Sequence, residues 1–229
     1  MNAAKDCTLQ EKLLRCAMAL ILAAGALLAS VAASPAYAAP STVDVSIGGK
    51  IPYGGFATTW MSADGNIAYC AEPSSPTPAA GSYSTSPVPS GDVTATIWYS
   101  FGSPGFDASM FPGSWYDGGG WDDAKYAAAS HVLIAYAYSG SESAATHGTS
   151  AEFASWAKSE LIGGTFAKMK AGAGRVSAGF EAFCVRTGGG SQTLVSFSWS
   201  AGGVKVAKED SVAGAEPQGD ASLDGASFS

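Results

Sequence analysis

The chain has 229 residues, of which 47% are apolar and 14% are charged, and its formal net charge at neutral pH is −7. This length suits one domain and a further fragment, because a domain takes roughly 100–200 residues. The acidic balance argues against a nucleic-acid partner and against binding to an anionic lipid surface.

The first 38 residues have the pattern of a secretory signal peptide. The apolar run over residues 17–33 is followed by Ala36-Tyr37-Ala38, a small-residue cleavage pattern. Basic residues precede that run, at Lys5, Lys12 and Arg15. We therefore expect a secreted protein with a leader over residues 1–38 and a main domain over residues 39–202. An uncleaved anchor is the alternative.

Residues 43–47 alternate apolar and polar side chains, which predicts a half-buried strand. Gly48-Gly49 is then expected to turn the chain, and a second strand is expected over residues 56–61. Asp64-Gly65 is typical of a hairpin turn. This hairpin is expected to lead into a strand that ends at Cys70.

The segment 72–92 is rich in Pro, Ser and Gly, which predicts a long surface loop without regular structure. Residues 92–101 favour a short helix, and residues 103–120 are expected to be irregular. Asp122-Asp123 is typical of a helix start, because side-chain oxygens there accept from unpaired N–H groups. The helix is expected over residues 126–138.

A further helix is expected over residues 153–161, with Gly163-Gly164 as its stop. Strand-like alternation returns over residues 180–185, and residues 194–199 are expected to pair with them after a glycine turn. Strands, then helices, then strands predict an α+β fold. We expect an antiparallel β-sandwich or barrel with a helical insert, followed at residues 203–229 by the first strand of a truncated β-sandwich repeat.

Three stretches together resemble the thioester domain of Gram-positive surface adhesins, over about residues 47–199. In chain order they are Tyr69-Cys70-Ala71-Glu72-Pro73, Ile97-Trp98-Tyr99-Ser100-Phe101-Gly102 and Ala129-Ser130-His131. The resemblance implies a cell-surface adhesion domain. In that family a Cys sulfur and a Gln side-chain carbon join with loss of ammonia, and an amine of a host ligand can attack the resulting thioester.

The position that matches the family's Gln is His131, and an imidazole has no carboxamide carbon to acylate. After the leader the glutamines are Gln192 and Gln218. Gln192 follows a glycine turn rather than the matching motif, so a Cys70–Gln192 thioester is the less favoured alternative. We therefore expect non-covalent binding to a host or matrix ligand, no enzyme activity, and His131 hydrogen-bonded beneath the Cys70 strand.

Cys184 is the other cysteine of the main domain. Export would allow a disulfide between Cys70 and Cys184, and two separate buried thiols are the alternative. A thiol hydrolase is a further alternative, with Cys70 as nucleophile and His131 or His147 as base. The spacing of Cys and His predicts no metal site, and we expect no cofactor.

Trp115, Tyr116 and Trp121 flank Gly- and Pro-rich loops. If exposed, such aromatic residues suit recognition of sugars or proteins, so a secreted glycan-binding module is an alternative function. If buried, they are ordinary core residues.

Residues 203–229 resemble the opening of a SpaA/CnaB-like pilin repeat, on Val206-Ala207-Lys208-Glu209-Asp210 and the stretch 217–228. The resemblance implies that Lys208 forms an isopeptide bond with a later Asn. It also implies that further repeats follow residue 229 in a protein anchored to the cell wall.

Overall fold

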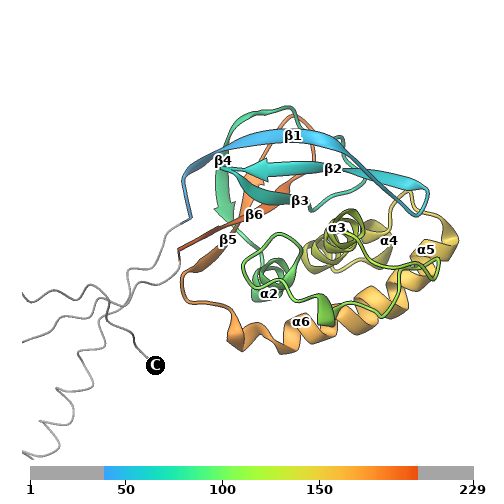
Figure 1. Ribbon diagram of the computed structural model, residues 1–229. Coiled ribbons are helices and arrows are strands. Elements are labelled where there is room, and N and C mark those ends of the chain that lie inside the picture. The colour runs from blue at the N-terminus through green and yellow to red at the C-terminus, as the bar shows by residue number, and fades with distance from the viewer. Residues whose placement is uncertain (1–38, 201–229) are drawn as a thin grey trace, which may run out of the picture. The chain divides into compact units, whose positions relative to one another are not determined.

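The computed structural model describes residues 39–200 (Figure 1). Within them, six antiparallel strands close a barrel in the order β1-β2-β3-β6-β5-β4. The helices lie together on one side of the strands (Figure 1). The predicted α+β fold with a helical insert is confirmed. The predicted leader, the predicted repeat and Lys208 lie outside the described residues.

β1 (Thr42–Tyr53) and β2 (Phe56–Ala63) form a long hairpin, and β3 (Asn66–Cys70) follows it. The predicted turn at Asp64-Gly65 is confirmed, and its two residues have φ values of 48° and 80°. Positive φ at both central residues is what a type I′ hairpin turn requires. The turn therefore sets the register that carries Cys70 to the far end of β3.

The predicted turn at Gly48-Gly49 is wrong, because β1 continues through both glycines. The register of β1 against β2 shifts between Ile47 and Lys50, as at a β-bulge. A Cβ atom on Gly48 would lie 3.0 Å from the Cβ atom of Trp60. Glycine here permits a close approach of two strands rather than a reversal of the chain.

β4 (Gly81–Pro87) lies inside the segment predicted to be irregular, so that prediction is wrong. The strand consists of small polar residues, Tyr83 and a terminal proline, and it lacks the aliphatic side chains that favour strands. It pairs with β1 on one side and with β5 on the other. Its conformation is set by these two partners, and the pairing closes the barrel.

β5 (Phe180–Arg186) and β6 (Leu194–Trp199) confirm the predicted final hairpin. β6 lies between β5 and β3. Alternate residues of the strands fill the barrel with apolar side chains, as expected for a small barrel. The buried members are Val43, Val45, Met61, Ala63, Ala68, Cys70, Phe183, Val185 and Leu194.

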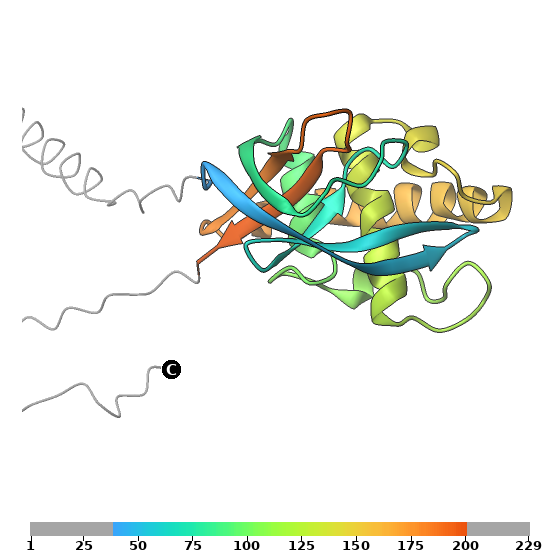
Figure 2. The same cartoon turned by 90° about the horizontal axis from the view of Figure 1, so that it is seen from above.

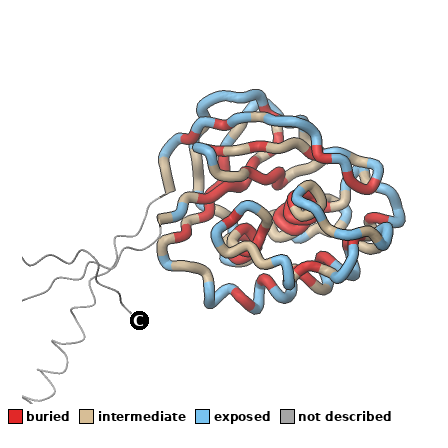
Figure 3. The backbone as a smooth tube through the Cα atoms, viewed as in Figure 1, coloured by how far each residue is buried: buried red, intermediate tan, exposed pale blue. Residues whose placement is uncertain are grey.

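α2 (Gly91–Tyr99) confirms the predicted short helix, and a 3₁₀ turn, η1 (Ala108–Met110), follows in the irregular segment. α3 (Asp123–Ser139) begins as predicted, since the Asp122 side chain accepts from the Lys125 N–H at 2.9 Å. The central residues of α3 are buried (Figure 3). α3 is therefore the central helix of the layer beside the barrel.

α4 (Glu142–Ala145) and α5 (Ala151–Trp156) follow, and the predicted helix stop at Gly163-Gly164 is wrong. The chain continues as a π-helical segment, η2 (Ala157–Phe166), then as α6 (Ala167–Ala171) and η3 (Ala173–Arg175). Each helical glycine costs about 1 kcal/mol. Burial along the segment offsets that cost, at Leu161, Ile162 and Met169.

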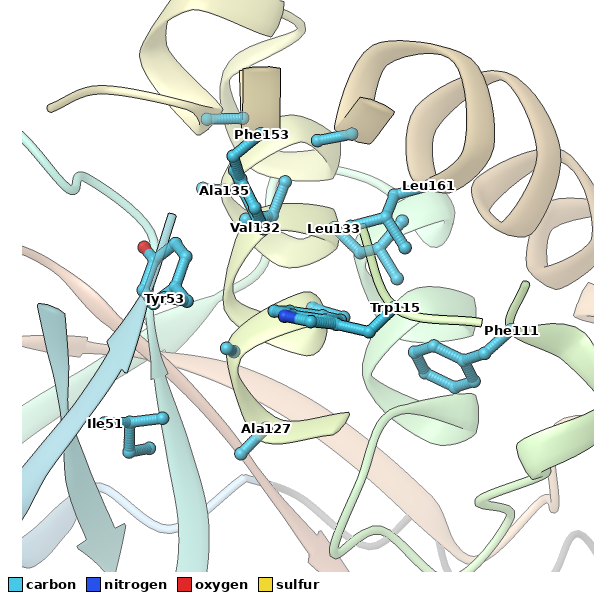
Figure 4. Close-up of a cluster of buried hydrophobic side chains, with 14 of the residues drawn as sticks. Ile51, Tyr53, Phe111, Trp115, Ala127, Val132, Leu133, Ala135, Phe153 and Leu161 are labelled. Atoms are coloured by element: carbon cyan, nitrogen blue, oxygen red, sulfur yellow. The ribbon is translucent and has the colours of Figure 1, made fainter. Parts of the chain in front are cut away.

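An aromatic-rich core joins the helices to the outer half of β1 (Figure 4). Ile51 and Tyr53 reach it from β1, and Trp115 reaches it from the irregular segment. The Trp115 ring lies 5.6 Å from the Phe153 ring, centroid to centroid. The β1–β2 hairpin thus extends beyond the barrel and crosses α3 (Figure 2).

The two ends of the described chain leave the barrel on the same side (Figures 1 and 2). β1 begins there, and β6 ends there at Trp199, opposite Phe180. Cys70 lies at the other end of the barrel, where it is paired with Leu194. No helix within residues 39–200 has both the length and the apolar character needed to cross a bilayer.

Gly140→Ala is expected to lower the free energy of unfolding by about 1 kcal/mol, because a left-handed φ disfavours a Cβ atom. Gly140 ends α3 with φ 68°, and no atom lies within 4 Å of the place of a new Cβ. The cost is therefore one of backbone conformation alone. Urea unfolding measures it, with Gly91→Ala as the control at a helical glycine whose φ is not positive and whose Cβ would also meet nothing. Equal stability of the two variants would contradict this account.

Candidate functional site

Cys70 and Gln192 face each other at one end of the barrel. The Cys70 thiol donates to the side-chain oxygen Oε1 of Gln192, across 122 positions of sequence. Cys70 is 4% exposed and Gln192 is 3% exposed. The pairing of β3 with β6 brings them together, because Cys70 lies opposite Leu194 in the ladder. The register of two strands therefore builds the contact.

The backbone on both sides of the Gln192 side chain is fixed. Its N–H donates to the Pro76 carbonyl at 3.0 Å, and its carbonyl accepts from Thr187 Oγ1 at 2.8 Å. Three glycines with positive φ, Gly188, Gly189 and Gly190, make the preceding turn. With its backbone groups bonded elsewhere, Gln192 presents only its carboxamide to the thiol.

His131 lies on α3, beneath the Cys70 strand. Its Nδ1 atom accepts from the Cys70 backbone N–H at 3.0 Å, and Thr58 Oγ1 lies 3.4 Å from the same nitrogen. The ring meets the Tyr69 ring edge-on, with 5.1 Å between centroids. The predicted hydrogen bond beneath the strand is confirmed. His131 supports the Cys70 backbone, and the carboxamide that faces the sulfur comes from Gln192.

Burial decides the charge of these groups. It lowers the pKa of His131 to about 3, so the imidazole is neutral, with Nδ1 as acceptor and its proton on Nε2. Burial also raises the pKa of the Cys70 thiol to about 12. The site at neutral pH therefore holds an uncharged thiol, an uncharged imidazole and an amide.

The hydrolase alternative requires a side chain that takes the Cys70 proton in every turnover. The His131 nitrogen nearest Cys70 is occupied by a backbone N–H, and burial makes the ring a weak base. The other candidate base, His147, is exposed and contacts Phe56 with its ring edge-on.

Cys184 is free, as is Cys70, and the disulfide alternative is wrong. Cys184 lies on β5 opposite Val195, one row along the sheet from the row of Cys70 and Leu194. Side chains of neighbouring rows point to opposite faces of the sheet. Cys70 and Cys184 also lie two strands apart, which separates them by about 10 Å. A disulfide needs Cα atoms within about 7 Å. Cys70 and Cys184 are therefore buried separately and are not bonded to each other.

A cavity of about 180 Å³ opens beside the Cys70–Gln192 contact. Tyr53, Phe56 and Thr58 line it from the β1–β2 hairpin, and Pro76 and Thr77 line it from the loop after β3. No charged side chain is among the residues that line it. The cavity therefore suits a slender, uncharged group that reaches the buried pair.

The aromatic residues proposed for ligand binding do not form an exposed patch. Trp115 is 4% exposed and belongs to the core in Figure 4, so of its two predicted roles the structure shows that of a core residue. Trp121 is half-buried, and its ring stacks on Tyr126 with 4.7 Å between centroids. Tyr116 is also half-buried and meets Phe153 edge-on. Packing against other aromatic residues accounts for all three positions.

Among residues 39–200, no group of three or more His, Cys, Asp or Glu side chains lies close enough together to hold a metal ion.

A family model described as a thioester domain matches residues 42–164, which is more than half of the chain. The chain belongs to the thioester domain family. The match confirms the resemblance drawn from the Cys70 and His131 stretches and supports an adhesin-like domain. It does not extend to residues 203–229, so the pilin-type repeat remains a prediction. No curated protein and no solved structure matches the chain.

Proposed function

We propose that this thioester domain forms an internal bond between Cys70 and Gln192 and uses it to capture an amine of a surface ligand. The observation that carries the proposal is the contact of the buried Cys70 thiol with the Gln192 carboxamide. This replaces the non-covalent binding predicted from His131, because the acyl donor is supplied by another residue.

The proposed chemistry has two steps. In the first, the Cys70 sulfur attacks the Gln192 side-chain carbonyl carbon. An S–C bond forms, the C–N bond breaks, and the amide nitrogen takes the thiol proton and leaves as ammonia. In the second, a neutral primary amine attacks the same carbon, an amide forms, and the amine proton returns to Cys70. The domain acts once, so it is not an enzyme.

The burial of Cys70 and Gln192 would protect a thioester between them from water. Water would hydrolyse an exposed thioester, and here both partners are at least 96% buried. The cavity beside them is small and uncharged, which favours an unbranched primary amine such as a lysine side chain in its neutral form. The backbone N–H of Cys70 is held by His131, so the sulfur is fixed against the cavity.

We further propose that the domain acts outside the cell as the adhesin-like head of a wall-anchored bacterial surface protein. The leader pattern over residues 1–38 and the family support this setting. The proposed partner is a protein or glycan of a host or matrix surface that carries an accessible amine. The acidic net charge gives no support for a nucleic-acid partner.

The intact mass of a purified fragment of residues 39–200 tests the proposed bond. We expect the wild type to be lighter than its sequence mass by one ammonia and to gain one methylamine when treated with that amine. Cys70→Ala should show its full mass and no adduct, whereas the control Cys184→Ala should behave as the wild type. A wild type at full mass, with both thiols titratable after unfolding, would support non-covalent binding instead.

A further inference from the structure

Glu72 joins the strand segment of Cys70 to the strand segment of Gln192. The Ala71 N–H donates to the Thr193 carbonyl at 3.0 Å, as in a regular ladder. The Thr193 N–H donates at 2.8 Å to the Glu72 side-chain oxygen Oε2, where a regular pair would use the Ala71 carbonyl. A side chain thus completes the β3–β6 ladder at its last position.

This contact lies close in sequence to both reacting residues. Glu72 is two residues after Cys70, and Thr193 is the residue after Gln192. Pro73 follows Glu72 and has no N–H of its own, so it cannot extend the ladder as a donor. A bond from a backbone N–H to a carboxylate is charge-assisted and stronger than one to a neutral acceptor. Glu72 therefore holds the two partner segments together at the point where backbone pairing ends.

We propose that Glu72 is a positioning residue for thioester formation, an inference that rests on the proposed Cys70–Gln192 bond. Its carboxylate fixes the peptide after Gln192 and so keeps the carboxamide carbon against the Cys70 sulfur. Glu72 does not line the cavity beside the pair. It acts through Thr193 and not on the incoming amine. Its loss should slow formation of the thioester more than capture by a thioester already formed.

Treatment with ammonia allows the rate of thioester formation to be measured separately from amine capture. Ammonolysis of the thioester restores the Gln192 carboxamide and the Cys70 thiol, which is the reverse of the first step. Removal of ammonia by rapid desalting then allows the bond to form again, and intact mass follows the loss of one ammonia with time. The proteins to compare are full chains of the wild type, Glu72→Ala, Glu72→Gln and the control Glu160→Ala, which removes an exposed carboxylate.

Glu72→Ala should re-form the bond about tenfold more slowly, since a factor of ten corresponds to the loss of ~1.4 kcal/mol, close to the lower end of the range for a hydrogen bond to a charged group. Glu72→Gln keeps an acceptor oxygen and should be slower by about threefold, because a neutral acceptor bonds about half as strongly. The control should match the wild type. Methylamine capture, measured per thioester present, should stay within about twofold of the wild type for every variant whose bond has formed.

Melting temperatures of the same substitutions in a Cys70→Ala background separate positioning from folding. The rates of thioester re-formation are measured well below those temperatures, where every variant is folded. If Glu72 only stabilised the fold, its substitution would leave these rates unchanged. If Glu72→Ala and Glu72→Gln both re-form the bond at the wild-type rate, Glu72 has no positioning role. If the wild type never loses ammonia, the proposed thioester itself fails, and the role of Glu72 fails with it. Should Glu72→Ala not fold, the Glu72→Gln rate decides.

Discussion

Gln192→Glu is expected to abolish amine capture completely, although it changes only one non-hydrogen atom of the side chain. A carboxyl group has no ammonia to release, so the Cys70 sulfur cannot displace it to form the thioester at neutral pH. The variant keeps the length of the side chain and an oxygen that can accept from the thiol, as Gln192 Oε1 does. We expect its intact mass to equal its sequence mass, and a labelled primary amine to give no adduct on a denaturing gel.

Two further variants make this result specific. Gln192→Ala removes the acyl donor without introducing a buried carboxyl group, and it should also give no adduct. Gln218→Glu is the matched control, because Gln218 is the other glutamine after the leader. In the full chain it should capture the labelled amine as the wild type does. Labelling of Gln192→Glu at the wild-type level would show that Gln192 is not the acyl donor.

His131 is expected to make the domain sensitive to acid. Burial lowers its pKa from 6.5 to about 3 in the folded state. Between these values the unfolded state binds more protons, so the free energy of unfolding falls as the pH falls through this window. From about pH 7 to pH 4, the loss from this one residue should be about 3 kcal/mol. Urea unfolding at a series of pH values measures it.

His131→Gln isolates this contribution. A glutamine oxygen can accept from the Cys70 N–H in place of Nδ1, and it has no proton to gain in this range. The variant should therefore lose less stability toward pH 4 than the wild type does, by about 3 kcal/mol. His147→Gln, at an exposed histidine, should keep the wild-type profile. Matching pH profiles for His131→Gln and the wild type would mean that His131 is not the acid-sensitive group.

Local sequence patterns predicted the elements that local physics determines. Asp122 caps α3, Gly140 ends it, and Asp64-Gly65 makes the hairpin turn, because each depends on a few neighbouring residues. β4 was missed, because its polar residues become a strand only through pairing with β1 and β5. The continuation past Gly163-Gly164 was missed for the same kind of reason, since burial of apolar neighbours stabilises it.

The site was predicted in part. The Cys70 stretch and the place of His131 beneath it follow from the family resemblance and hold in the structure. The contact of the Cys70 thiol with Gln192 does not follow from the sequence, because sequence order does not reveal that β6 pairs with β3. One signal was available: Gln192 is the single glutamine between residues 39 and 200 and directly precedes a strand of the final hairpin.

The arrangement of β6 has a mechanical consequence for a head that has captured its ligand. The ligand would be bonded to Gln192, just before β6, while the chain continues toward residue 229 from the other end of that strand. Tension between ligand and tether would then run lengthwise along β6. β3 and β5 flank β6 with ladder hydrogen bonds, which lie across the direction of pull and are loaded in shear. Many bonds would have to yield together, so this geometry resists detachment under flow.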